Sequence, residues 1–308
     1  MVSGPLQPIL VLPVYRGGAK FERALRSIRN AEQHFSRILI SLNSERDSPD
    51  SQAVQAYLSH ADSKIEFIQS GTELPWMSHQ YFWLEHLERT GATGDQWVYW
   101  FAHDDEVKAS GITAITDADG NWPLQPGTIY LGPWAMRPDE PDRMYDGPTD
   151  IALESWTSFP IQGPLELPVA EWIAEQFIQP TYINMSGCIT QLRSFQQLRD
   201  FRRQKPGGMR IEMATAAARF NLNVAEFPEP VVITYSCAAS DRTKYAKVAR
   251  QDDRHLVFWL LRYVAAHPRA ALPLARACAI VLNYHLRYRL TGTGLQSEDW
   301  RYRTTVNP

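Results

Sequence analysis

The fold class that we expect for this chain is decided by one stretch, Trp97-Val98-Tyr99-Trp100-Phe101-Ala102-His103-Asp104-Asp105-Glu106-Val107. Its first five residues are aromatic or β-branched, which favours a buried β-strand. Carboxylates follow, so the strand would deliver acidic groups to its C-terminal end. Ligands of open α/β sheets bind at that edge, and carboxylate oxygens suit hard cations such as Mg²⁺ or Mn²⁺. The alternative is that Asp104, Asp105 and Glu106 only cap a turn on a solvated surface.

Composition and charge indicate an ordinary soluble protein. The chain has 308 residues and a formal net charge of -3, which gives no electrostatic argument for binding nucleic acid. Its 3 cysteines are far apart and form no CxxC pair, which excludes a disulfide framework and an ordinary zinc-cysteine site. The apolar run near the N-terminus is broken by Pro13 and is too short for a signal peptide. We therefore expect a cytoplasmic protein.

Strands and helices alternate over the first part of the chain. Short apolar runs predict the strands, and apolar residues at helical spacing predict the helices. In chain order these segments are strand 8–15, helix 21–33, strand 37–42, helix 52–60, strand 64–69 and helix 77–90. Such alternation predicts a parallel sheet with right-handed crossovers, a common nucleotide-binding architecture. His79 would lie near the ligand edge, although a lone histidine is more often structural.

The second part of the chain has a less regular pattern. We predict strands at 127–132, 224–227 and 231–235, a helix over 195–201 capped by Ser194, and a helix over 211–220. The residues from 137 to 168 are rich in proline and acids and predict an excursion over the active-site edge.

Residues 253–290 predict helices in which apolar residues alternate with arginines. This segment is too charged to span a bilayer. We expect a packed helical hairpin, then an oligomer face, then an interfacial membrane element, in that order of preference.

The order of these motifs resembles family 2 glycosyltransferases of the GT-A fold over about residues 8 to 236. The similar features are the first strand through Pro13-Val14-Tyr15, the second strand ending at Ser41 to Ser44, the strand into Asp104-Asp105, the turn 187–193 and the segment Phe227-Pro-Glu-Pro230. The resemblance implies a mixed, mostly parallel α/β sheet flanked by helices. It also implies a glycosyltransferase domain at 1–240 and a C-terminal helical extension at 241–308.

The resemblance implies an inverting, metal-dependent transferase of the hexosyl type, active in polysaccharide or glycoconjugate synthesis. It would move a sugar from a UDP-, GDP- or dTDP-sugar to a hydroxyl of a glycan or a lipid-linked acceptor. Mn²⁺ or Mg²⁺ would lie between Asp105 and the diphosphate, and Asp104 would hold the ribose or a metal-bound water. The nucleoside would contact residues from three segments: Pro13, Val14, Tyr15, Ser41, Asn43 and His79.

Glu212 is our candidate for the general base that deprotonates the acceptor, because it would lie in the first turn of the helix 211–220. The alternative is that Glu212 only stabilises that helix through its dipole.

The chain departs from the family pattern at three places. Ala102 replaces the first acid of the acidic motif, Ser41-Leu42-Asn43-Ser44 replaces Asp-Asp-Gly-Ser, and Met209-Arg210 stands where the family has Glu-Asp. These losses leave open a catalytically silent nucleotide- or sugar-binding protein. A nucleotidyltransferase is a further alternative, for which Arg16-Gly17-Gly18 is a faint phosphate-binding loop. Whichever of these functions the protein has, we expect self-association, or contact of the C-terminal helices with the inner face of a membrane.

Overall fold

The structure is a computed structural model that describes residues 6–58, 64–131, 134–138, 167–168, 186–202 and 223–236, together with Ala265, Pro268 and Ala275. The chain divides into two compact units. The first comprises Met1–Pro164, Asn184–Arg199 and Ala225–Ser236 and contains the candidate site. Of the second unit, the description covers mainly a short antiparallel pairing, Asn223 with Pro168 and Val224 with Leu167.

Strands and helices alternate at the start of the chain, as predicted. The described elements are β1 (Ile9–Val14), α1 (Gly18–Arg29), η1 (Glu32–His34), β2 (Arg37–Leu42), α2 (Pro49–Leu58), β3 (Ile65–Gln69), α3 (Trp76–Arg89), β4 (Trp97–Trp100), β5 (Glu106–Val107), α4 (Ala109–Ile115), β6 (Thr128–Leu131), β7 (Trp134–Pro138), β8 (Leu167–Pro168), β9 (Cys188–Gln191), α6 (Leu192–Arg202), β10 (Asn223–Glu226) and β11 (Val232–Ser236).

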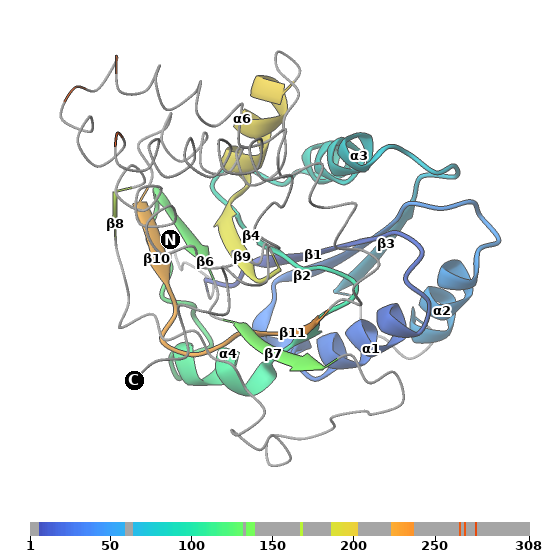
Figure 1. Cartoon of the computed structure of the whole chain (residues 1–308), viewed down its shortest axis with the longest axis horizontal. Helices are drawn as coiled ribbons and strands as arrows, with labels where there is room; N and C mark the ends of the chain where they lie inside the picture. Colours follow the sequence, from blue (N-terminus) through green and yellow to red (C-terminus); the bar gives the residue numbers. More distant parts are fainter. Residues whose placement is uncertain are drawn as a thin grey trace, which may run out of the picture. The chain divides into compact units, whose positions relative to one another are not determined.

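The larger sheet has the strand order β3-β2-β1-β4-β9-β6-β10-β8. Strand β1 pairs in parallel with β2 and β4, and β2 pairs in parallel with β3. Strand β9 is antiparallel to both β4 and β6. Figure 1 shows α1 and α2 on one side of the strands β1 to β3, and α3 on the other side. The predicted mixed α/β sheet flanked by helices is therefore confirmed.

The core forms where the aromatic residues of β4 meet the segment after α1. All six residues of β1 are buried, as expected for a parallel strand covered on both faces. The ring centroids of Phe35 and Tyr99 are 5.4 Å apart, and those of Tyr99 and Trp122 are 5.9 Å apart. The Trp122 indole N–H donates to the His34 carbonyl at 2.9 Å, so this large side chain is buried without an unsatisfied polar group.

The acidic stretch follows the end of β4, as predicted, for Asp104 and Asp105 but not for Glu106. Strand β4 ends at Trp100, and Asp104 and Asp105 lie in a turn that the Asp105 amide closes onto the Ala102 carbonyl at 3.3 Å. Glu106 belongs instead to β5, which pairs antiparallel with β11 in a three-stranded sheet of order β5-β11-β7. Asp104 and Asp105 thus lie together in the turn after β4, whereas Glu106 is part of the second sheet.

One further prediction for the second half of the chain needs correction, and one strand there was not predicted. Ser194 does not cap the helix, because α6 begins at Leu192 and the Ser194 hydroxyl accepts a hydrogen bond from Thr190 at 3.1 Å. The strand that was not predicted is β7, which pairs with β11 almost a hundred residues later. Only its last two residues, Arg137 and Pro138, fall within the expected excursion.

Other predictions for the second half are not tested by the described residues. The helix 211–220 and nearly all of 241–308 lie outside them, so the boundary at residue 240 stays a prediction. No helix within the described ranges is long and apolar enough to cross a membrane.

Helix α4 is held against the segment before β11 by a close backbone approach at Gly111. A Cβ atom added at Gly111 would lie 1.8 Å from the Pro230 carbonyl oxygen, which no rotamer can relieve because the obstacle is backbone. We expect Gly111→Ala to lower the free energy of unfolding by roughly 1–3 kcal/mol or more, as overpacking does.

Chemical denaturation of both variants measures this effect. The matched control is Ser110→Ala, an exposed position on the same helix, which should change the free energy of unfolding by less than about 0.5 kcal/mol. Equal stability of the two variants would show that α4 can move away from Pro230 at no cost.

Candidate functional site

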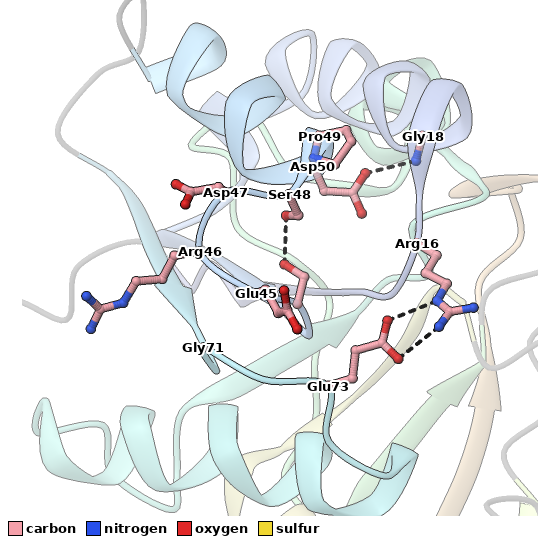
Figure 2. Close-up of a pocket in the computed structure, with 11 residues that line it drawn as sticks. Arg16, Gly18, Glu45, Arg46, Asp47, Ser48, Pro49, Asp50, Gly71 and Glu73 are labelled. Atoms are coloured by element: carbon pink, nitrogen blue, oxygen red, sulfur yellow. Dashed lines mark hydrogen bonds and ion pairs between the residues drawn. The ribbon is translucent and has the colours of Figure 1, made fainter.

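A pocket opens at the carboxyl ends of β1, β2 and β3, in the first unit of the chain (Figure 2). Its volume is about 710 Å³. Three loops line it, with the residues Arg16, Gly18, Ser44, Glu45, Arg46, Asp47, Ser48, Pro49, Asp50, Gly71 and Glu73. This is the sheet edge at which open α/β folds bind ligands.

Asp50 joins two of these loops. It is buried in the first turn of α2, and its carboxylate accepts the backbone N–H groups of Gly17 and Gly18, each at 2.9 Å. A carboxylate that accepts two amide hydrogen bonds is a strong interaction, because the acceptor is charged. It fixes the start of α1 to the start of α2.

Arg16 and Glu73 face each other across the rim of the pocket (Figure 2). The guanidinium Nε donates to Glu73 Oε1 at 3.0 Å and its Nη2 donates to Oε2 at 2.9 Å, which is a bidentate ion pair. The Tyr15 hydroxyl donates to the same carboxylate at 3.4 Å, and the Tyr15 ring lies 5.1 Å from the Arg16 guanidinium carbon. The hydrogen bond from Arg16 holds the pKa of Glu73 below its usual value.

The structure brings together two of the predicted nucleoside contacts, Ser41 and His79. The Ser41 hydroxyl and the His79 Nε2 are 2.9 Å apart, and both side chains are buried. The His79 Nδ1 has no hydrogen-bond partner among the described residues, and burial lowers the pKa of the imidazole to about 4. His79 is therefore neutral at physiological pH.

The other predicted nucleoside contacts end the strands beside this pair. The Asn43 side chain donates to the Leu74 carbonyl at 2.8 Å and accepts the Leu74 amide at 2.6 Å, so it holds the loop that precedes α3. Its own amide donates to the Val14 carbonyl. Pro13 and Val14 are buried, whereas Tyr15 is 39% exposed at the rim. Their predicted role in binding a nucleoside stays a prediction.

The acidic turn places its two aspartates in different environments. Asp104 is half-buried, and its backbone carbonyl accepts a hydrogen bond from Arg23 at 3.2 Å. Asp105 is only 4% exposed and lies close enough to Tyr99 to add to the effect of burial in raising the pKa of that phenol. Of the two acids, Asp104 is thus the one that a ligand can reach from solvent.

Glu106 is held away from that edge by an ion pair. Its carboxylate lies 3.5 Å from the Arg23 Nε, and both side chains are buried. Arg23 therefore anchors the acidic turn at two points, the Asp104 carbonyl and the Glu106 carboxylate. No group of three or more acids, histidines and cysteines with metal-binding geometry occurs within the described ranges.

Sequence reasoning missed three residues at this site: Asp50, Glu73 and His103. The His103 ring lies against Gly17, where an added Cβ would be 3.2 Å from its Cδ2 atom, and it bonds to the Pro13 carbonyl. Burial lowers its pKa, while Asp104 and Asp50 oppose that effect. Asp50 could have been found from its position, because it is an acid in the first turn of a helix that follows a strand. No local sequence pattern marks Glu73. Glu212, the predicted base, lies outside the described residues.

No protein-family model and no curated protein sequence matches the chain. Among solved structures, the chain is similar to residues 1–349 of S. aureus TarS in complex with UDP-GlcNAc, with 10% identity and a TM-score of 0.56 over 96% of this chain and 78% of that one. It is also similar to the mannosyltransferase PcManGT from Pyrobaculum calidifontis in complex with GDP-Man and Mn²⁺, with 11% identity and a TM-score of 0.49 over 99% and 81% of the two chains. The second score is too low to bear on the fold. The first shows that the chain has a GT-A-like fold.

The neutral state of His79 predicts a dependence of stability on pH. The unfolded chain binds this proton near pH 6.5, whereas the folded chain binds it near pH 4. The contribution of His79 is therefore complete above pH 6.5 and is lost as the pH falls toward 4, by at most about 3 kcal/mol. We expect the stability of the wild type relative to His79→Gln to decrease over this range in urea denaturation. A difference between the two proteins that is independent of pH would contradict the assignment.

Proposed function

We propose that the protein is a glycosyltransferase that uses a nucleotide sugar. The observation that carries the proposal is the pocket at the carboxyl ends of β1, β2 and β3 in a GT-A-like fold. Its volume of about 710 Å³ is of the size that holds a nucleoside diphosphate. The TarS structure of the same fold is in complex with UDP-GlcNAc, which supports a donor of this class.

The residues around the pocket suit the two halves of such a donor. The side chains Tyr15 and Ser44 offer ring and hydroxyl contacts for a nucleoside, and the exposed Arg16 offers positive charge for its phosphates. We propose that the sugar lies beyond the phosphates, toward Asp104. His103 connects the two regions, because it contacts Gly17 and precedes Asp104.

A divalent cation, Mn²⁺ or Mg²⁺, fits this arrangement. Mg²⁺ in phosphate-binding enzymes is usually held by one or two carboxylates and the substrate phosphates, so a site does not need three protein ligands. The resemblance assigned the metal to Asp105, but this side chain is only 4% exposed, so we propose the half-buried Asp104 carboxylate as the protein ligand instead. When bound, the cation would neutralise the charge that develops on the leaving diphosphate. Arg23 would then serve to fix the turn on which Asp104 lies.

The acceptor side of the proposal depends on Glu212. A base opposite the leaving group removes the proton of the acceptor hydroxyl, and attack from that face inverts the anomeric configuration. Support for Glu212 comes from its predicted position in the first turn of a helix that follows the acceptor side of the fold. The acceptor, a glycan or a lipid-linked sugar, is proposed on the resemblance alone.

The structure makes one alternative less favourable. A nucleotidyltransferase would need the backbone N–H groups of Arg16-Gly17-Gly18 for a triphosphate. Those of Gly17 and Gly18 already donate to the buried Asp50 carboxylate, so the loop has few backbone donors left. The silent nucleotide- or sugar-binding protein remains a competing hypothesis, because Ala102 and Met209-Arg210 lack the family acids.

Calorimetry with UDP, GDP and dTDP, followed by turnover of the matching nucleotide sugars on an acceptor panel, tests the proposal. We expect one diphosphate to bind and its sugar to be transferred. Binding without turnover would favour the silent protein, and no binding would remove the proposed function. Self-association through 253–290 and contact with the inner face of a membrane are further proposals that light scattering and vesicle pelleting can test. A cytoplasmic location is also a proposal, which cell fractionation can test.

The acidic turn offers a matched pair of substitutions one residue apart. Because Asp104 is the accessible acid, we expect Asp104→Asn to weaken Mn²⁺-dependent nucleotide binding on the order of tenfold or more. Asp105→Asn should mainly lower the free energy of unfolding, by about 1–3 kcal/mol, because Asp105 is buried. Calorimetry with and without Mn²⁺ and chemical denaturation separate these effects. Wild-type metal dependence in Asp104→Asn would show that the turn is only structural.

Glu212→Gln tests the base. We expect turnover to fall on the order of 10²- to 10⁴-fold, while nucleotide affinity and the melting temperature stay near those of the wild type. A loss of stability with unchanged transfer would indicate that Glu212 only stabilises its helix. In that case the base must be sought among other acids, such as Asp150, Glu154 or Glu171.

A further inference from the structure

The rim of the pocket carries an ion pair that is well formed but easily exchanged. Arg16 and Glu73 come from loops 57 residues apart and make two parallel hydrogen bonds of 3.0 and 2.9 Å. Their side chains are 69% and 45% exposed, so water and salt weaken their attraction. Despite its good geometry, the ion pair is therefore weak, and a more highly charged anion can take the place of Glu73 on Arg16.

The backbone at Arg16 adds a second observation. Its φ of 50° lies in the left-handed region and is the only positive φ of a non-glycine residue in the described part of the chain. Such a conformation is unfavourable for a residue with a long side chain, and it is found where the surrounding structure imposes it. Here Asp50 fixes the next two residues, Gly17 and Gly18. The two hydrogen bonds to Asp50 therefore determine the direction in which the Arg16 side chain leaves the loop.

The same hydrogen bonds to Asp50 limit the donors that this loop can offer to an anionic ligand. The amides of Gly17 and Gly18 are occupied by Asp50, so this loop can offer a phosphate mainly the Arg16 guanidinium. The guanidinium now presents its Nε and Nη2 donors to the two oxygens of Glu73. Two oxygens of a phosphate have a matching arrangement and accept the same pair of donors.

We propose that Arg16 binds the diphosphate of the nucleotide and that Glu73 holds the Arg16 side chain until the diphosphate displaces it. The proposal rests on the proposed function and assigns a ligand-exchange step to its pocket. In the free protein the Glu73 carboxylate occupies the donors of the Arg16 guanidinium for which a phosphate would compete. Glu73 thus lowers nucleotide affinity, and it also excludes weaker anions from the guanidinium.

This exchange makes opposite predictions for its two members. Arg16→Gln should weaken the binding of whichever of UDP, GDP and dTDP binds the wild type, roughly tenfold, because a bidentate contact to a charged group is lost. Glu73→Gln should strengthen the same nucleotide about two- to fivefold, because the competing carboxylate is removed. The gain should disappear in the double variant, since Arg16 is then absent. The matching nucleoside without phosphates should bind all four proteins within about twofold.

Arg46→Gln is the matched control. It removes the same charge from the same pocket, but Arg46 points away from the Arg16–Glu73 pair in Figure 2. We expect it to change diphosphate affinity less than Arg16→Gln does. An equal loss would mean that only the general positive charge of the pocket matters and would overturn the proposal. Melting temperatures check that each variant is folded.

Calorimetry at fixed ionic strength gives the remaining outcomes. Weaker binding of both diphosphate and nucleoside by Glu73→Gln would make Glu73 a direct nucleoside ligand and would also overturn the proposal. So would an unchanged diphosphate affinity in Arg16→Gln. If the wild type binds none of UDP, GDP and dTDP, the proposed function itself fails. That is a different result from a wild type that binds one of them while Arg16→Gln makes no difference.

Discussion

The candidate site depends on the buried carboxylate of Asp50. It accepts the two amides with which α1 begins, and it does so from the first turn of α2, where the helix dipole also favours a negative charge. Without it, the buried Gly17 amide would be left without an acceptor, at a cost of about 1–3 kcal/mol. Because the amides are fixed, the left-handed Arg16 before them is fixed too. One side chain thus sets both the shape of the loop and the groups that it offers to a ligand.

A second constraint acts on the acidic turn. The buried pair of Arg23 and Glu106 ties α1 to β5, and Arg23 also bonds the Asp104 carbonyl. Buried ion pairs often contribute little net stability, because desolvation offsets the attraction between the charges. Their geometry is nevertheless well determined, so the pair is better understood as a device that positions the turn. The loop after β1 and the acidic turn are therefore both anchored at α1, the loop through Gly17 and Gly18 and the turn through Arg23.

The sequence predicts the first half of the fold well, because that half is built from local patterns. Apolar runs mark β1, β2 and β3, and helical spacing marks the helices between them. Ser41 and His79 were both expected near the ligand edge, but the hydrogen bond between them was not predicted. Strand β5 is different: it has two residues, and its partner β11 is more than a hundred residues away. Glu73 is likewise visible only once the loops are assembled, because its partner Arg16 is 57 residues away in the chain.

The distribution of polar groups gives a physical reason for the neutral side chains at the end of β2. At the end of β2, Ser41 and Asn43 are neutral, buried and hydrogen-bonded to His79 and Leu74. Ser41 pairs with the neutral His79 imidazole without burying a charge, whereas an aspartate at this position would bring a carboxylate into the same buried place. The charges of this pocket lie instead on its exposed loops, where Arg16 and Glu73 remain hydrated. In such a site the nucleoside would be recognised mainly by shape and neutral hydrogen bonds, and the phosphates by the rim.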